Sequence, residues 1–267
     1  MSNFKNYTEA NREAWNEAMP HHQKSNGDKW DKVFSKPGFS VIIEPELSLI
    51  NSLNIEGQKI AHVCCNNGVE LMSLKNMGAG ECVGFDISDK AIQEAQARAA
   101  RFDIACEFIQ TDIYDIPEQY HDEFDIVYIS IGCLGWMPGI QRFFGKIASL
   151  LNESGELFIH ESHPFSEMLP ADELENVDPM KIIEPYFKKD PYIDNDGIDY
   201  IGKTSYPSKT MYWFVWTLSD ILMGIIDNGL KVRHFSEYPD DISTQHGKNQ
   251  AAGLDIPLSY ILIAEKE

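Results

Sequence analysis

One stretch of the sequence, from Lys59 to Asp89, constrains the fold more than any other. It opens with a short apolar run, Ile60–Cys65, of the length and composition expected for a buried strand. Asparagines and Gly68 follow, and these residues tolerate the tight turn that a strand needs before the chain reverses into a helix. After that helix a second apolar run, 82–85, leads into Asp86. The stretch therefore predicts a strand–turn–helix–strand unit with a carboxylate at the tip of its second strand.

This unit has the features of a nucleoside-binding site. In an open parallel sheet, ligands bind beyond the carboxyl ends of the strands, where backbone N–H groups are free. The carboxylate of Asp86 could accept hydrogen bonds from the two vicinal hydroxyls of a ribose. A phosphate cradle would need several glycines, as in G-x-G-x-x-G, whereas the turn Cys64–Gly68 contains one. The composition of the turn disfavours a dinucleotide and favours a nucleoside ligand that has no diphosphate.

Residues 60–163 resemble a class I S-adenosylmethionine-dependent methyltransferase. The similarity is greatest to a bacterial branch whose first strand reads like LHLQCxxG, which His62, Cys65 and Gly68 match. The segment Ile159–Pro164 resembles the end of the fifth strand in that branch. The resemblance implies a Rossmann-like α/β fold with a seven-stranded, mostly parallel sheet and an antiparallel last strand inserted beside the fifth. It also implies S-adenosylmethionine as the cofactor and S-adenosylhomocysteine as the product.

The resemblance assigns roles to residues at the ends of the strands. Asp86 is expected to hold the ribose, and Asp112, after a third strand at 106–110, corresponds to the acid that meets the adenine amine. Residues 130–132, at the end of a fourth strand (124–129), are expected beside the methyl donor. The cofactor-binding residues predicted in this way are His62, Cys64, Asn66, Gly68, Asp86, Ile87, Asp112, Ile113, Ser130, Ile131, Gly132 and Trp15. The alternatives are that Asp112 only caps a turn and that Trp15 only packs on the sheet.

The first turn departs from the pattern of the family. His62 stands where the family usually has its first acid, and Cys64 and Asn66 stand where it has its first two glycines. These differences concern the end of the site that would hold the methionyl group, and they leave Asp86 unaffected. They also keep open an alternative function, in which the protein binds S-adenosylmethionine without methyl transfer, as a sensor or a degenerate subunit. A nucleotide-dependent oxidoreductase is disfavoured, because G-x-G-x-x-G is absent.

Methyl transfer needs few catalytic groups. The reaction is an in-line displacement at a sulfonium, so most of the acceleration can come from positioning. A base is needed only if the acceptor loses a proton of high pKa, and the candidates are His163, His160, Tyr7 and His21. A packing role for each histidine is the alternative. The sequence His160-Glu161-Ser162-His163 resembles a metal cluster, but side chains alternate along a strand, so no metal site is predicted.

The charge of the chain bears on its partners. There are 42 acidic against 22 basic residues, a formal net charge of −20, whereas nucleic-acid enzymes usually carry a basic surface. The Asn/Asp-Pro-Pro-Tyr motif of enzymes that methylate nucleobase or glutamine amines is absent after the fourth strand. We therefore expect a small-molecule acceptor, and neither nucleic acid nor a membrane as partner. The polar N-terminus, the lack of an apolar run of about 18 residues and the odd number of cysteines (5) favour a cytoplasmic location.

The chain is expected to form a single domain, residues 1–267, with two additions to the core. A helical N-terminal region, residues 1–55, would cover the cofactor, and its first helix (4–24) would end at Pro20-His21-His22. A cap, defined as about residues 165–211, would cover the mouth of the site. Within the cap, the turn signal Asp194–Gly197 predicts a local hairpin between 192–193 and 198–200.

The C-terminal part predicts a helix and two strands. The helix spans 220–228, is capped by Ser219, and is followed by strands at 231–238 and 257–264. An exposed aromatic run, Tyr212–Phe214, could form the interface of a homo-oligomer.

Overall fold

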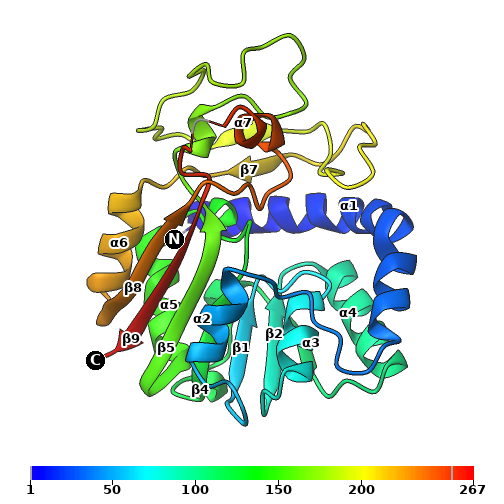
Figure 1. The fold of residues 1–267 in the computed structure, drawn as a ribbon, viewed down its shortest axis with the longest axis vertical. Coiled ribbons are helices and arrows are strands. Elements are labelled where there is room, and N and C mark those ends of the chain that lie inside the picture. The colour runs from blue at the N-terminus through cyan, green and yellow to red at the C-terminus, as the bar shows by residue number, and fades with distance from the viewer. Residues whose placement is uncertain (1, 254) are drawn as a thin grey trace.

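The computed structural model describes residues 2–253 and 255–267, and its centre is a seven-stranded sheet in the order β3-β2-β1-β4-β5-β9-β8 (Figure 1). Neighbouring strands from β3 to β5 are parallel, and β9 lies antiparallel between β5 and β8. The strands are β1 Ile60–Val63, β2 Cys82–Asp86, β3 Glu107–Gln110, β4 Phe124–Ile129, β5 Leu151–Ser162, β8 Leu230–Tyr238 and β9 Ser259–Lys266. This confirms the predicted fold class, including the antiparallel last strand beside the fifth.

Helices cover both faces of the sheet, which explains why its central strands are almost entirely apolar. Along β1, Ala61 and Val63 enter the core beneath α5 and α6, while Ile60 enters the core beneath the helices of the opposite face. The helices are α2 Glu46–Ser52, α3 Val69–Asn76, α4 Asp89–Arg101, α5 Ile140–Leu150 and α6 Leu218–Ile226, with short 3₁₀ turns η1 Ile113–Asp115, η2 Glu118–Tyr120 and η3 Leu134–Trp136. None of the described helices is long and apolar enough to cross a membrane.

The first helix, α1, is longer than predicted. It spans Ser2–Phe34 with Pro20 inside it, so the predicted end at Pro20-His21-His22 is wrong. Tertiary contacts beyond the proline hold the second part, because His22 is buried with Nε2 2.7 Å from the carbonyl oxygen of Ile198. Figure 1 shows α1 crossing above the carboxyl ends of the strands and then bending down beside α4. Arg12 of α1 forms a 2.6 Å ion pair with Asp89 at the start of α4, and this contact fixes α1 over the carboxyl ends of the strands.

The cap contributes one strand to a two-stranded sheet, whose other strand begins where the cap ends, and the predicted local hairpin is absent. Strand β6 (Tyr192–Asp194) pairs antiparallel with β7 (Met211–Trp213), whereas 198–200 forms no strand. Ile198 is instead buried, with its carbonyl oxygen bound to His22 of α1. The segment after the Asp194 turn therefore packs against α1 and cannot pair with β6. The strand that pairs with β6 is β7, further along the sequence. A short 3₁₀ turn, η4 (Ser166–Met168), begins the cap.

Two further expectations for the C-terminal half need correction. Thr217 caps α6, not Ser219, because Thr217 and Asp220 form a reciprocal capping box. The aromatic residues 212–214 are half-buried, and Tyr7 packs against Tyr212 and Phe214 with ring centroids 4.7 and 5.4 Å apart. The sequence also gave no sign of α7 (Gly247–Ala251) in the connection between β8 and β9, which Figure 1 shows lying close to the cap.

Candidate active site

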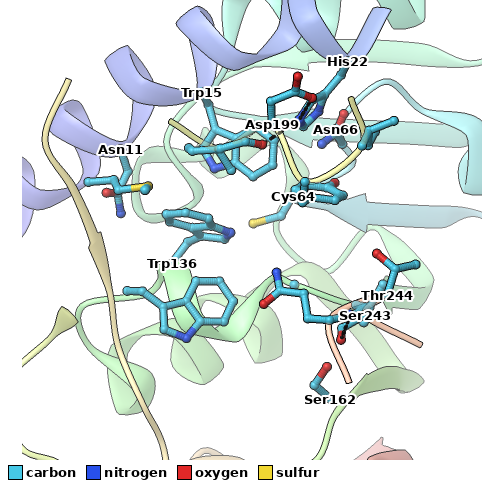
Figure 2. Close-up of a pocket in the computed structure, with 18 of the residues that line it drawn as sticks. Asn11, Trp15, His22, Cys64, Asn66, Trp136, Ser162, Asp199, Ser243 and Thr244 are labelled. Carbon is cyan, nitrogen blue, oxygen red and sulfur yellow. Dashed lines mark hydrogen bonds and ion pairs between the residues drawn. The ribbon is translucent and has the colours of Figure 1, made fainter. Parts of the chain in front are cut away.

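A cavity of about 1160 Å³ lies between the carboxyl ends of the central strands, α1 and the cap. Its lining includes Cys64, Asp86 and Ser130 from the sheet, with Trp15 and His22 from α1. The cap and the connection between β8 and β9 complete it (Figure 2). This is the edge of a parallel α/β sheet at which ligands bind.

Asp86 connects the first turn to the start of α4. Its Oδ2 accepts a 2.8 Å hydrogen bond from the backbone N–H of Asn66, and its Oδ1 accepts one of 2.8 Å from the N–H of Ser88. Burial raises the pKa of Asp86 to about 6, although these amide bonds oppose the shift. A carboxylate has about four acceptor positions, so backbone amides do not use all of those of Asp86, which lines the cavity.

The turn after β1 keeps a conformation that suits glycine, despite its composition. Cys64, Asn66 and Gly68 all have left-handed backbones, with φ of 54°, 48° and 74°. At Gly68 a Cβ atom would lie 2.4 Å from the ring of Phe108, so only glycine fits there. The two departures from the glycine pattern therefore do not abolish the left-handed conformation; the chain adopts it with Cys64 and Asn66.

His62 lies beneath the end of β4 and does not line the cavity. It is fully buried, its Nε2 lies 3.0 Å from Oγ of Ser130, and its ring packs edge-on against Tyr128 at 4.9 Å. Burial lowers the pKa of His62 to about 3, so the ring is neutral near pH 7. Since Ser130 lines the cavity, His62 supports a predicted site residue without contacting a ligand there itself. Gly68 likewise shapes the turn and is not part of the lining.

The other predicted cofactor residues come together in the cavity. Asp112 also caps η1, since its Oδ1 accepts a 3.0 Å hydrogen bond from the N–H of Tyr114, so capping and lining are compatible roles. The residues of the predicted set that line the cavity are Trp15, Cys64, Asn66, Asp86, Ile87, Asp112, Ile113, Ser130, Ile131 and Gly132.

The predicted bases lie outside the lining of the cavity, and their catalytic role stays a prediction. His160 Nδ1 lies 3.0 Å from Oε2 of Glu46 on α2, and His163 Nε2 lies 2.9 Å from Oε1 of Glu237 on β8. Tyr7 packs on the aromatic residues after β7, as described above, and none of the three lines the cavity. The two histidines thus pair with different elements, and among the described residues no group of three potential ligands could hold a metal ion.

On α1, His22 lines the cavity, and the predicted candidate His21 does not. His21 stacks on Tyr206 with ring centroids 4.5 Å apart, whereas the next residue, His22, lines the cavity. The helix was predicted to end at these residues. The helical periodicity could therefore not be used to predict which of the two histidines faces the cavity.

Glu161 has a structural role that the sequence did not reveal. Its Oε1 accepts hydrogen bonds from the N–H groups of Gly132 (2.7 Å) and Ser162 (2.8 Å). Its Oε2 accepts them from Cys133 (2.9 Å) and Leu134 (3.2 Å). One buried carboxylate therefore holds the whole loop after β4, where the methyl donor was expected. Burial raises the pKa of Glu161, and these four amide bonds oppose the rise.

Three tryptophans from distant parts of the chain form a cluster along the cavity, here named the tryptophan cluster. Trp15 and Trp136 have ring centroids 5.4 Å apart, and Trp136 and Trp213 have centroids 4.9 Å apart, both edge-on. Figure 2 shows the side chain of Cys64 pointing toward Trp15 and Trp136. Trp136 directly follows the loop held by Glu161, a position that could have indicated a site residue; nothing in the sequence pointed to Trp213.

Comparison with known proteins agrees with this geometry. Residues 60–155 match the family model of a methyltransferase domain. A tRNA U34 carboxymethyltransferase from Campylobacter hominis is 25% identical over 107 residues, which are 40% of this chain and 37% of that protein. An uncharacterized protein from Haemophilus influenzae is 23% identical over 141 residues, 51% of this chain and 55% of its own length. The matches thus span between about a third and just over half of these relatives.

Solved structures extend the likeness to most of the chain. A methyltransferase from Mesorhizobium loti described as S-adenosylmethionine-dependent has a TM-score of 0.60 at 20% identity, over 83% of this chain and 97% of that one. A protein from Listeria monocytogenes, described as a putative enzyme of the same kind, has a TM-score of 0.62 at 15% identity, over 82% and 97%. Residues 60–155 therefore match a methyltransferase domain, and most of the chain shares the Rossmann-like fold of these structures. The matched family segment runs from β1 into β5 and does not reach the cap.

Proposed function

We propose that the protein binds S-adenosylmethionine and transfers its methyl group to a small-molecule acceptor. The observation that carries this proposal is Asp86, which lies in the cavity with free acceptor positions, opposite a turn that has one glycine and no phosphate cradle. The domain match supports the same cofactor, because it covers both Asp86 and the turn.

Different residues of the cavity lining would hold different parts of the cofactor. Asp86 would hold the ribose hydroxyls, and Asp112 would meet the adenine amine between the apolar side chains of Ile87 and Ile113. The turn at Cys64 and Asn66 would hold the methionyl end, and Ser130–Gly132 would lie beside the methyl group. The cofactor itself supplies an electrophilic methyl group.

The cavity favours a second, small ligand. Its volume of about 1160 Å³ exceeds the roughly 300–1,000 Å³ of most single-ligand sites, so an acceptor can fit next to the cofactor. We infer that the cap acts as a lid for this acceptor and that α1 covers the cofactor. The net charge of −20 disfavours a polyanion such as RNA, although one relative acts on tRNA by its name.

Positioning would provide most of the catalysis. Because His160, His163 and Tyr7 are engaged outside the cavity, no base is assigned to them, and the acceptor would present its own lone pair to the sulfonium methyl. We also infer membership of the bacterial LHLQC-like branch, in which a neutral His62 under Ser130 takes the place of the usual acid.

Two measurements test the function. Calorimetry should detect binding of S-adenosylmethionine and S-adenosylhomocysteine but not of NAD, and production of S-adenosylhomocysteine should appear with fractions of a metabolite extract. Binding of NAD alone would overturn the proposal. Cofactor binding without turnover on any fraction would favour the sensor.

The pKa of Asp86 gives a pH dependence. The unliganded carboxyl has a pKa raised to about 6, and ribose hydroxyls donate to its ionised form, so cofactor affinity should fall as the pH drops through 6. At pH 5 the dissociation constant for S-adenosylhomocysteine should be about tenfold higher than at pH 8. Titration calorimetry at both values measures this change. Asp86→Asn should bind weakly at both pH values, and an unchanged pH dependence in that variant would assign the proton to another group.

A further inference from the structure

Glu167 is a carboxylate of the cavity that the proposed cofactor contacts do not use. It belongs to η4, is half-buried and lines the cavity. Its Oε2 accepts a 3.2 Å hydrogen bond from Nε1 of Trp213. Among the described residues, no Lys or Arg forms an ion pair with it, including Lys203 and Lys248, which line the same cavity. Burial raises the pKa of Glu167 to about 7, which reflects the lack of a compensating positive charge.

The tryptophan cluster beside Glu167 depends on the backbone for its position. The ring of Trp213 lies against Gly135, where a Cβ atom would be 2.3 Å from the indole. The N–H of Phe214 donates a 2.7 Å hydrogen bond to the carbonyl oxygen of Gly135, so β7 is fixed to the loop after β4. Contacts between β7 and the loop after β4 therefore fix the position of Trp213. Because Trp213 donates a hydrogen bond to Glu167, the same contacts help to fix Glu167.

Glu167 also lies at the end of the cavity proposed for methyl transfer. Trp213, which binds Glu167, packs edge-on against Trp136 of η3 at 4.9 Å between ring centroids, and η3 directly follows the loop after β4. That loop contains residues 130–132, which line the cavity. A ligand group that meets Glu167 would therefore approach the loop where the sulfonium methyl is expected.

We propose that the methyl acceptor is a small molecule with an amine cation, and that its ammonium group lies between Glu167 and the tryptophan cluster. The ammonium nitrogen has no lone pair, so it serves for recognition, and a different atom of the acceptor attacks the methyl group. This inference rests on the proposed function, because the other half of the cavity is taken to hold the cofactor. A cationic ligand compensates the negative charge of a buried carboxylate. A neutral ligand leaves that charge uncompensated, and an anionic ligand is repelled by it. Tryptophan is also the side chain that attracts a cation most strongly through its ring.

Matched pairs of probes test the proposal in the complete protein saturated with S-adenosylhomocysteine at pH 8, where Glu167 is ionised. The pairs are tryptamine and tryptophol, phenethylamine and 2-phenylethanol, and choline and 3,3-dimethylbutan-1-ol, each a cation with a neutral counterpart of similar shape. Calorimetry should show at least one cation binding about tenfold or more tighter than its counterpart. Absence of any such preference would overturn the proposal.

Two substitutions identify the group that recognises the cation. Glu167→Gln should remove the preference, and Glu153→Gln, the same charge change at an exposed residue near the start of β5, should keep it. A preference that survives Glu167→Gln, or that Glu153→Gln abolishes equally, would contradict a local role for Glu167. The affinity for S-adenosylhomocysteine is measured in each protein, and should not change. Failure of the wild-type protein to bind S-adenosylhomocysteine would refute the proposed function separately, since the probes can also be titrated without it.

Discussion

Replacing Asp86 by alanine is expected to weaken the binding of S-adenosylhomocysteine by about 1.5–3 kcal/mol, or roughly 10- to 150-fold. This is the range for losing hydrogen bonds to a charged group, and Asp86 lines the cavity. Titration calorimetry of the purified variant measures the change. An unaltered dissociation constant would mean that Asp86 does not hold the ribose.

A matched control is needed because Asp86 also binds two backbone amides, those of Asn66 and Ser88. Asp125, at the start of β4, has a similar structural role: its Oδ2 accepts a 2.7 Å hydrogen bond from the N–H of Lys59, at the opposite edge of the sheet. Asp125→Ala should therefore lower stability without changing cofactor affinity. Comparable weakening in both variants would point to general loosening of the fold.

Replacing Glu161 by alanine should have the largest effect on stability, a decrease of about 3 kcal/mol or more in the free energy of unfolding. The side chain accepts four backbone hydrogen bonds, and the N–H groups of Cys133 and Leu134 are buried, so alanine leaves them without a partner. For a chain of this size the loss corresponds to a melting temperature about 6–12 °C lower. Calorimetric or spectroscopic melting measures it.

Glu156→Ala is the matched control for Glu161, on the same strand and half-buried. We expect a change below about 1 kcal/mol, as for most surface substitutions. Similar destabilisation of both variants would indicate that the loop after β4 does not depend on Glu161. Glu161→Gln should be intermediate, since one amide oxygen can replace only part of the acceptor set.

The regular part of the fold followed from local patterns. Apolar runs predicted β1, β2 and β4 because parallel strands buried on both faces must be apolar along their whole length. Asp86 was predicted as a site residue for the same reason: a polar residue directly after such a run must lie at the edge of the sheet. The helix boundaries were less reliable, since Thr217 and Ser219 are both acceptable caps in isolation.

The upper half of the cavity could not be predicted in the same way. Pro20 normally ends a helix, yet α1 continues because His22 is held by Ile198, which lies 176 positions further along the chain. The same contact removes Ile198 from the predicted hairpin and gives β6 a distant partner. No local sequence pattern indicates a contact between residues so far apart in the chain. Length and composition therefore located the cap, but they did not predict which strand pairs with β6.

By itself, the sequence determined the strand–turn–helix–strand unit, its turn with one glycine and the place of Asp86 at the tip of the second strand, because each depends on residues that are neighbours in the chain. The seven-stranded sheet was predicted from the family resemblance. Only the tertiary structure decided which polar residues reach the cavity. His160 and His163 pair with Glu46 and Glu237, whereas Glu167 at the start of the cap and Trp213 just after its end meet there. The physical reason is that burial and hydrogen-bond partners are properties of the packed molecule. A side chain's role in the site therefore depends on segments that its own neighbours in the sequence do not specify.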